Sequence, residues 1–152
     1  MSVGEFCNRE VIVVKQDESV REAVKLMRTH HVGDVVIVAR EGDASRPLGI
    51  LTDRDVVLEI LAEDVDIDSV NVGDVMSYEL ATVDESASLM DAVKLMQSKG
   101  VRRLPVVNGQ GYLVGILTVD DLVEIVSEEL GDVARLISRE LRIEEKRRRK
   151  ES

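Results

Sequence analysis

Two short strings in the sequence end an apolar run with a threonine and place an aspartate three residues later. They read GILTDRD over residues 49–55 and GILTVDD over residues 115–121. The aspartate then falls in the first turn of a following helix, where hydroxyl and carboxylate can satisfy free backbone N–H groups as a capping box. The same helix end can instead bind an anion, with the hydroxyl beside a phosphate or ribose and the carboxylate accepting from a vicinal diol. Gly49 and Gly115 allow either a ligand or another backbone segment to approach closely.

The two strings belong to two copies of one unit. Val3-Gly4 recurs as Val72-Gly73, and Ala23–Met27 recurs as Ala92–Met96, both at an offset of 69 residues. The offset falls to 66 at the two strings, so the first copy has three extra residues between Met27 and its GILT string. The insertion lies in residues 41–46, whose composition is typical of a turn.

Each copy predicts the order β-α-β-β-α after a short leading turn or helix. Runs rich in β-branched residues predict strands, two of which form a hairpin, and apolar residues at helical spacing follow Ser19 and Ser88, which suit N-caps. One small unit buries too little surface to be stable, so we expect the copies to pack as one pseudo-two-fold α/β (α+β) body. The expected divisions are repeat one at 1–62, a connector at 63–71, repeat two at 72–130, and an amphipathic helix with a basic tail at 131–152.

Composition limits the classes of function open to the chain. Its 152 residues suit one domain, and no run reaches the roughly 18 apolar residues that span a membrane, so we expect a cytoplasmic protein. Cys7 is the only cysteine, so no internal disulfide is expected. With only His30 and His31 as further ligands of this kind, the sequence predicts no metal site. The net charge of −10 disfavours nucleic acid as a partner, although residues 142–150 carry a charge of +4. That tail is either a solvated end or a contact for nucleic acid or an acidic partner.

The second copy adds further motifs: VGDVM at 72–76, AVKLM at 92–96 and VRRLPVV at 101–107. With these and the two GILT strings, residues 3–127 resemble the CBS-domain pair, or Bateman module. The resemblance implies two β-α-β-β-α repeats that pack through their sheets and leave two pseudo-symmetric clefts. In that family the clefts commonly bind adenosyl ligands such as AMP, ADP, ATP or S-adenosylmethionine. The family's role is regulatory, including energy sensing, so no enzymatic activity and no cofactor are expected.

The resemblance also implies which residues form each cleft. In the family the aspartate holds the ribose hydroxyls, the threonine lies near ribose and phosphate, and the base lies against the opposite copy. The first cleft is expected to consist of Cys7, Ile12, Val32, Gly33, Arg103, Ile116, Thr118, Asp120 and Asp121. The second is expected to consist of Met76, Ala81, Val101, Arg102, Ile50, Thr52, Arg54 and Asp55.

The two copies differ where a phosphate would bind. Arg103 matches a family position that often contacts phosphate, but its equivalent in the first copy is Asp34. We therefore expect a phosphorylated ligand in the first cleft. The second is either empty or takes an uncharged or cationic adenosyl compound, unless Arg54 or Arg102 compensates. The alternative for Arg102 and Arg103 is a surface pair bonded to acidic neighbours.

The resemblance favours a stand-alone regulatory module, commonly a homodimer, that acts through its own dimer or on a separate protein target. An enzyme related to inosine monophosphate dehydrogenases, which contain this module as an insertion, is not expected, because the chain has no catalytic barrel and no histidine close to Cys7 in the pattern. The alternative is a protein- or nucleic-acid-interaction module that uses the C-terminal basic segment. Its apolar residues would pack on a dimer or a partner, and they are Val133, Leu136, Ile137 and Leu141.

Overall fold

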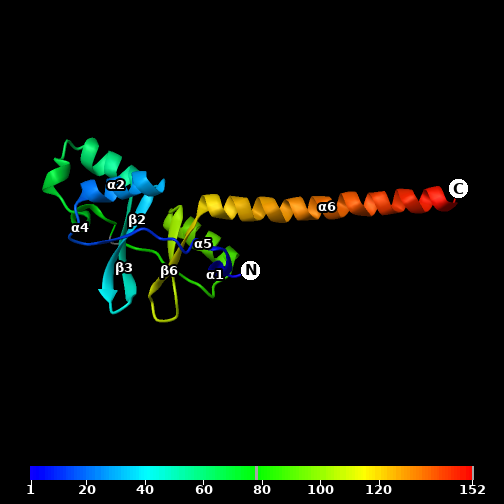
Figure 1. Cartoon of the computed structure of the whole chain (residues 1–152), viewed down its shortest axis with the longest axis horizontal. Coiled ribbons are helices and arrows are strands. Elements are labelled where there is room, and N and C mark those ends of the chain that lie inside the picture. Colours follow the sequence, from blue (N-terminus) through cyan, green and yellow to red (C-terminus); the bar gives the residue numbers. More distant parts are fainter. Residues whose placement is uncertain (78, 152) are drawn as a thin grey trace. The chain divides into compact units, whose positions relative to one another are not determined.

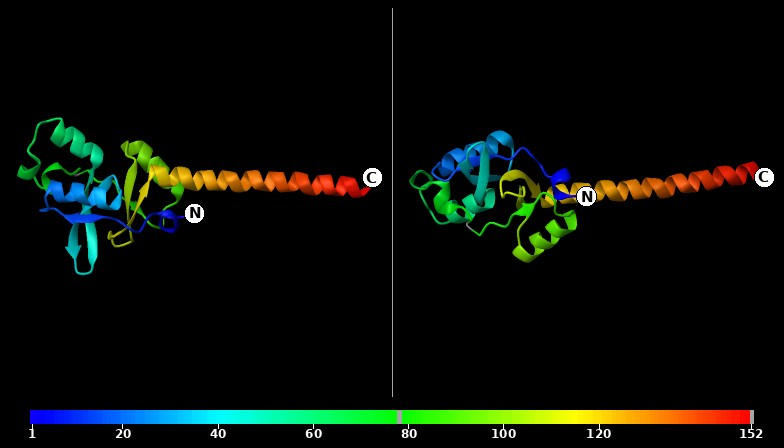
Figure 2. Two further views of the ribbon diagram at one scale, coloured as in Figure 1. Left: turned by 45° about the horizontal axis from the view of Figure 1, so that its top comes forward. Right: turned by 90° about the horizontal axis from the view of Figure 1, so that it is seen from below.

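The computed structural model describes residues 1–77 and 79–151, which form two compact units. The first unit, Met1–Leu117, contains both sheets, and we call it the body. The second unit begins at Thr118 and consists of one long helix. Figure 1 follows the chain from blue to red, and Figure 2 gives two further views.

Each repeat contributes a three-stranded sheet with a helix after its first strand. The strand orders are β1-β2-β3 and β4-β5-β6, with the first two strands of each sheet parallel and β2 antiparallel to β3. Repeat one comprises α1 (Val3–Phe6), β1 (Val13–Lys15), α2 (Val20–His30), β2 (Asp34–Glu41), β3 (Ala44–Thr52), α3 (Asp53–Val56) and the π-helical turn η1 (Val57–Leu61). The remaining elements are the 3-10 turn η2 (Ile67–Ser69), α4 (Val72–Val75), β4 (Val83–Asp84), α5 (Leu89–Lys99), β5 (Arg103–Val107), β6 (Leu113–Thr118) and α6 (Val119–Glu151). The predicted mixed α/β class and the duplicated order of elements are confirmed.

The two longest helices of the body begin and end at equivalent positions. Ser19 and Ser88 each accept a hydrogen bond from the backbone N–H three residues later, at 3.1 and 3.0 Å, which confirms both predicted N-caps. His31 and Gly100 follow the last helical residues with φ of 53° and 65°. A left-handed residue at this place is a common way to end a helix. Local sequence therefore sets the length of α2 and α5.

The hairpin of repeat one differs from the prediction at its turn. Residues 41–46 were expected to form a loop, but β2 and β3 extend into this segment and pair up to Glu41 and Ala44. The turn is reduced to Gly42, which has a φ of 64°, and Asp43. The prediction of a long turn is wrong because cross-strand pairing outweighs the turn-like composition, so the three inserted residues lengthen the hairpin.

The leading segment of each repeat docks on the other repeat. The backbone N–H of Val3, at the start of α1, donates to the Ala87 carbonyl at 2.8 Å. At the equivalent place, the N–H of Val72 in α4 donates to the Glu18 carbonyl at 2.8 Å. Because each repeat completes its partner in this way, the two form one pseudo-two-fold body, as the sequence predicted.

Apolar side chains join the two sheets inside the body. Val36 and Val38 of β2 cluster with Ile116 of β6, and all three are less than 7% exposed. Ile50 of β3 and Leu113 of β6 pack against this cluster. Burial of branched apolar side chains from both repeats stabilises the pair as one core.

The second unit is α6, a helix of 33 residues drawn as the long ribbon in Figure 1. Gly131, where we expected a division, lies inside this helix. Glycine in a helix interior costs roughly 1 kcal/mol relative to alanine, which the good helix formers on both sides offset. Among the described residues, no helix is both long and apolar enough to cross a membrane.

Candidate functional site

Both GILT strings form capping boxes. In repeat one the N–H of Thr52 donates to Asp55 Oδ2 at 2.9 Å, and the N–H of Asp55 donates to Thr52 Oγ1 at 3.1 Å. The corresponding distances for Thr118 and Asp121 are 3.1 and 3.2 Å. The cap uses one carboxylate oxygen, Oδ2, so Oδ1 of each aspartate can accept from another donor. Capping and diol binding are therefore compatible at both strings.

The glycines of the two strings make room for the chain itself. A Cβ at Gly49 would lie 2.7 Å from both Met76 Sδ and the Ser77 carbonyl oxygen. A Cβ at Gly115 would lie 2.6 Å from Cys7 Sγ and 2.9 Å from the Asn8 carbonyl oxygen. Of the two interpretations that the sequence left open, close approach of another backbone segment is the one observed.

Arg103 is placed between the repeats. Its Nε lies 2.8 Å from Asp34 Oδ2, and the side chains of Arg103 and Asp34 are 29% and 14% exposed. A Cβ at Gly33 would lie 2.8 Å from Arg103 Nη2 and 3.1 Å from Asp53 Oδ2. The guanidinium thus lies over Gly33 with carboxylates from repeat one close by, so Arg103 has the acidic neighbour that the surface-pair interpretation expected.

The other first-cleft residues within the body lie on segments that cross between repeats or edge the first sheet. Cys7 packs against Gly115, next to Ile116, whose backbone exchanges two hydrogen bonds with Asn8. The carbonyl of Ile12 accepts from the N–H of Val36 at 2.9 Å, and the N–H of Val32 donates to the Met27 carbonyl at 3.0 Å. The second unit, which starts at Thr118, contains the last three predicted residues: Thr118, Asp120 and Asp121.

The second-cleft residues all lie in the body. Met76 is 5% exposed and packs over Gly49, and the carbonyl of Ile50 accepts from the N–H of Ser77 at 3.1 Å. Those contacts join the repeats beside the Thr52–Asp55 cap. Among the remaining predicted residues, Ala81 and Val101 are half-buried. Arg54 and Arg102 are exposed.

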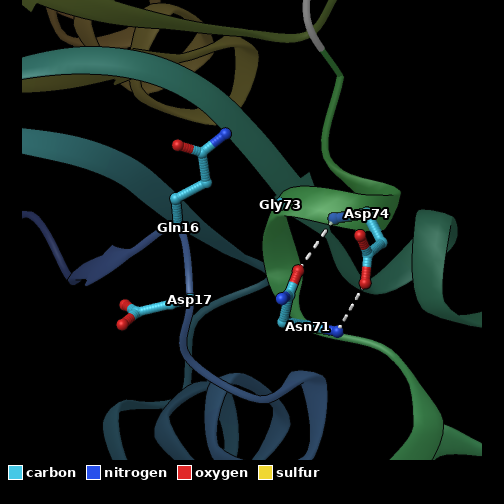
Figure 3. Close-up of a pocket in the computed structure, with 5 residues that line it drawn as sticks. All are labelled: Gln16, Asp17, Asn71, Gly73 and Asp74. Carbon is cyan, nitrogen blue, oxygen red and sulfur yellow. Dashed lines mark hydrogen bonds between the residues drawn. The ribbon is translucent and has the colours of Figure 1, made fainter.

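An open pocket of about 320 Å³ lies where α4 docks on repeat one, and the sequence predictions did not include it (Figure 3). It is lined by Gln16, Asp17, Asn71, Gly73 and Asp74. Asn71 and Asp74 form a further capping box, at 3.0 and 3.1 Å. Two carboxylates make this pocket unsuitable for a phosphate. The spacing of Asn71 and Asp74, which matches that of the GILT caps, is the signal that could have found it.

A second pocket, of about 200 Å³, lies between the hairpin of repeat one and β6. Its lining mixes apolar side chains with a serine and one charged residue of each sign, and it consists of Arg9, Val11, Val13, Asp43, Ala44, Ser45, Leu113 and Val114. Neither pocket is lined by residues predicted for the two clefts.

Comparison with known proteins identifies the family. A family model for the CBS domain matches residues 3–62 and 72–128. An uncharacterized protein of Methanopyrus kandleri is 40% identical over 125 residues, which cover 82% of this chain and 62% of that protein, so the chain spans less than two thirds of its length. The CBS domain-containing protein YhcV of Bacillus subtilis is 38% identical over 121 residues, which cover 80% of this chain and 82% of YhcV. Among solved structures, a CBS domain protein of Pyrobaculum aerophilum complexed with AMP matches with a TM-score of 0.73 at 25% identity, over 84% of this chain and 99% of that one. The chain therefore belongs to the CBS domain family and contains two CBS domains in tandem.

Proposed function

We propose that this protein is a non-catalytic regulatory module that binds an adenosine-containing ligand in the clefts between its two CBS domains. The ligand is of the AMP, ADP, ATP or S-adenosylmethionine type, and binding changes the conformation of a dimer or of a protein partner. The duplicated Thr-x-x-Asp cap carries the proposal, because each of Asp55 and Asp121 has an oxygen outside the cap for the ribose hydroxyls. The AMP complex of the Pyrobaculum aerophilum relative supports the choice of ligand.

The first cleft is the proposed site for a phosphorylated ligand. Arg103 supplies the positive charge there, and a phosphate can approach it only in competition with Asp34, whose carboxylate is 2.8 Å away. A charge-assisted hydrogen bond to phosphate is strong enough for such competition. The second cleft lacks an arginine at the equivalent position, so we expect it to favour an adenosyl compound without phosphate, or to be empty.

A regulatory role without catalysis is the second part of the proposal. CBS-domain proteins are typically regulatory and non-catalytic. The side chains of the two caps are already committed to holding helix ends, which suits ligand recognition better than proton transfer. Signalling then depends on how ligand contacts with both repeats change the surface offered to a partner.

Isothermal titration calorimetry with AMP, ATP, S-adenosylmethionine and adenosine tests the proposal. Asp121→Ala should weaken binding at the first cleft and Asp55→Ala at the second. The loss of a hydrogen bond to a carboxylate costs about 1–3 kcal/mol, or roughly 5- to 150-fold in affinity. Because these substitutions also remove a cap, matched controls are needed.

Asp74→Ala and Asp91→Ala provide those controls. Each removes the aspartate of a capping box, at α4 and α5, that is outside the predicted clefts. They should lower stability to a similar extent and leave ligand affinity unchanged. The proposal is wrong if no adenosyl compound binds the unmodified protein below millimolar concentration, or if the controls weaken binding as much as Asp121→Ala does.

A further inference from the structure

The C-terminal half of the long helix α6 carries basic side chains along one side. Arg139, Arg142, Lys146 and Lys150 follow one another at steps of three, four and four residues. At 100° per residue, their positions fall within an arc of about 80°, and all four are exposed. We call these four residues the basic face. Because α6 is helical as far as Glu151, the basic face is part of an ordered helix surface.

The charges of the basic face are not compensated within the helix. Residues three and four positions apart are neighbours on a helix, and like charges there are destabilising. At these positions Arg139 and Lys146 have only basic and apolar neighbours. In the part of the chain that the structure describes, no ion pair joins Arg139, Arg142 or Lys146 to a carboxylate. The helix dipole favours cations only in the last turn, so a negatively charged partner is the remaining source of compensation.

The residues opposite the basic face argue against a lipid surface as this partner. Glu140 and Glu144 lie about 120° and 160° around the helix from Lys146. Between positions 142 and 150, Ile143 is the only apolar residue. A helix that lies on a membrane buries a continuous apolar side at the level of the headgroups. Here the same burial would place carboxylates in an anionic surface.

Basic residues also lie on both flanks of the basic face. Arg147 lies about 100° to one side of Lys146, and Arg149 lies about 60° to the other side. A flat acidic surface contacts only one side of a helix, whereas a groove with two negatively charged walls contacts both flanks. The major groove of B-DNA is about 12 Å wide and admits an α-helix between its two phosphate backbones. The distribution of charge around the helix therefore favours duplex DNA over an acidic protein.

The acidic part of α6 ends before the basic face begins. From Val119 to Asp132 the helix has six acidic residues and no basic one, and Asp132 itself pairs with Arg135. At 1.5 Å per residue, Arg142 lies about 15 Å along the axis from Asp132. This distance exceeds the Debye length of about 8 Å at physiological ionic strength. Screening therefore limits how far the acidic part of the helix opposes binding of DNA at the basic face.

We propose that the basic face binds the phosphate backbone of double-stranded DNA, with the last turns of α6 in the major groove. Contacts with phosphates position a protein on the duplex but carry no sequence information, so binding should not depend on sequence. This activity is separate from the binding of an adenosyl ligand proposed above. Either can fail without the other, because the tests use different ligands and different variants.

Fluorescence anisotropy of a labelled DNA duplex of about 20 base pairs, titrated with the full chain, tests the proposal. At about 50 mM salt the dissociation constant should be roughly 1–100 µM, the range of non-specific binding. Four phosphate contacts give a slope of about −3.6 in a plot of log K against log salt concentration, or a loss of about 150-fold between 50 and 200 mM. Double-stranded RNA of the same sequence should bind at least roughly tenfold more weakly, because its major groove is too narrow for a helix.

Two matched variants test the face. Arg139 and Arg148 are nine residues apart and lie on opposite sides of the helix. Arg139→Gln should reduce the slope by about 0.9 and the affinity about eightfold near 100 mM salt. Arg148→Gln removes the same group and should leave the affinity within about twofold. Circular dichroism checks that both variants keep their helix content.

Four results would overturn the inference. They are no binding of DNA at about 50 mM salt with up to about 100 µM protein, equal losses from Arg139→Gln and Arg148→Gln, RNA bound as tightly as DNA, and tighter binding to phosphatidylserine vesicles than to DNA. Binding of DNA with the steep salt dependence, weakened by Arg139→Gln and kept in Arg148→Gln, supports it.

Discussion

Gly115 provides the sharpest test of how the two repeats are joined. It lies in β6, where the segment that contains Cys7 and Asn8 crosses from the other repeat. Asn8 and Ile116 exchange two backbone hydrogen bonds there, at 2.9 and 2.8 Å. In Gly115→Ala the new Cβ would lie 2.6 Å from Cys7 Sγ and 2.9 Å from the Asn8 carbonyl oxygen. Both separations are shorter than van der Waals contact.

The two contacts do not relax equally. Cys7 Sγ can move by rotation about χ1, but the Asn8 carbonyl belongs to the backbone and can retreat only if the hydrogen bonds with Ile116 lengthen. Overpacking typically costs about 1–3 kcal/mol, and a weakened hydrogen bond adds about 0.5–1.5 kcal/mol. Alanine also lowers the conformational entropy of the unfolded chain, which stabilises the folded state by about 0.4–1 kcal/mol. We therefore expect Gly115→Ala to lower the free energy of unfolding by about 2 kcal/mol.

Urea denaturation, followed by tyrosine fluorescence at a fixed protein concentration, measures this loss. Gly109→Ala is the control, because a Cβ at Gly109 meets no atom within 4 Å and its φ is not in the left-handed range. The control should remain within about 0.5 kcal/mol of the unmodified protein. A second substitution, Cys7→Ala, should restore only part of the loss, since the Asn8 carbonyl remains. If Gly115→Ala is as stable as the control, the crossing segment does not hold the repeats together.

Three further predictions follow from particular contacts. Asp34→Asn removes the charge that faces Arg103, so calorimetry should show that AMP binds more tightly by ~1 kcal/mol, or about fivefold. The affinity for adenosine should not change, and an unchanged affinity for AMP would contradict the prediction. Thr52→Ala removes a cap and should lower the free energy of unfolding by about 1 kcal/mol in urea, whereas no change would mean that the cap adds nothing. The hydrogen bond from Arg46, assisted by that of Tyr112, lowers the pKa of Glu41 below its ordinary value of 4.5. This carboxylate therefore stabilises the fold above its ordinary pKa and stops doing so as pH falls through the lowered one. Carbon-detected NMR should place its midpoint below 4.5, and Arg46→Gln should raise the midpoint, since the largest cause of the lowered pKa is then removed.

Local features of the fold could be predicted from the sequence because local interactions produce them. Ser19 and Ser88 cap their helices through a backbone N–H three residues away, and that spacing can be recognised in a single sequence. The close approach at Gly49 and Gly115 could not be resolved in the same way. The sequence showed that something comes near these glycines, but the chain segments that do so lie far along the sequence. Only the packed body brings them together.

The same distinction explains Arg103. The sequence places Asp34 at the position in repeat one that is equivalent to Arg103. We interpreted this difference as the loss of a phosphate-binding arginine from the second cleft. Equivalent positions close to a pseudo-two-fold axis face each other, so a difference between copies there becomes a contact between them. Two arginines at these positions would repel unless an anion lay between them, whereas arginine and aspartate form the ion pair observed at 2.8 Å. The difference between the two copies therefore forms a contact between the repeats, and under the proposed function a phosphate that binds Arg103 would weaken that contact. Under the proposed function, a phosphate that takes Arg103 from Asp34 would couple ligand binding to the packing of the two repeats, because this ion pair joins them.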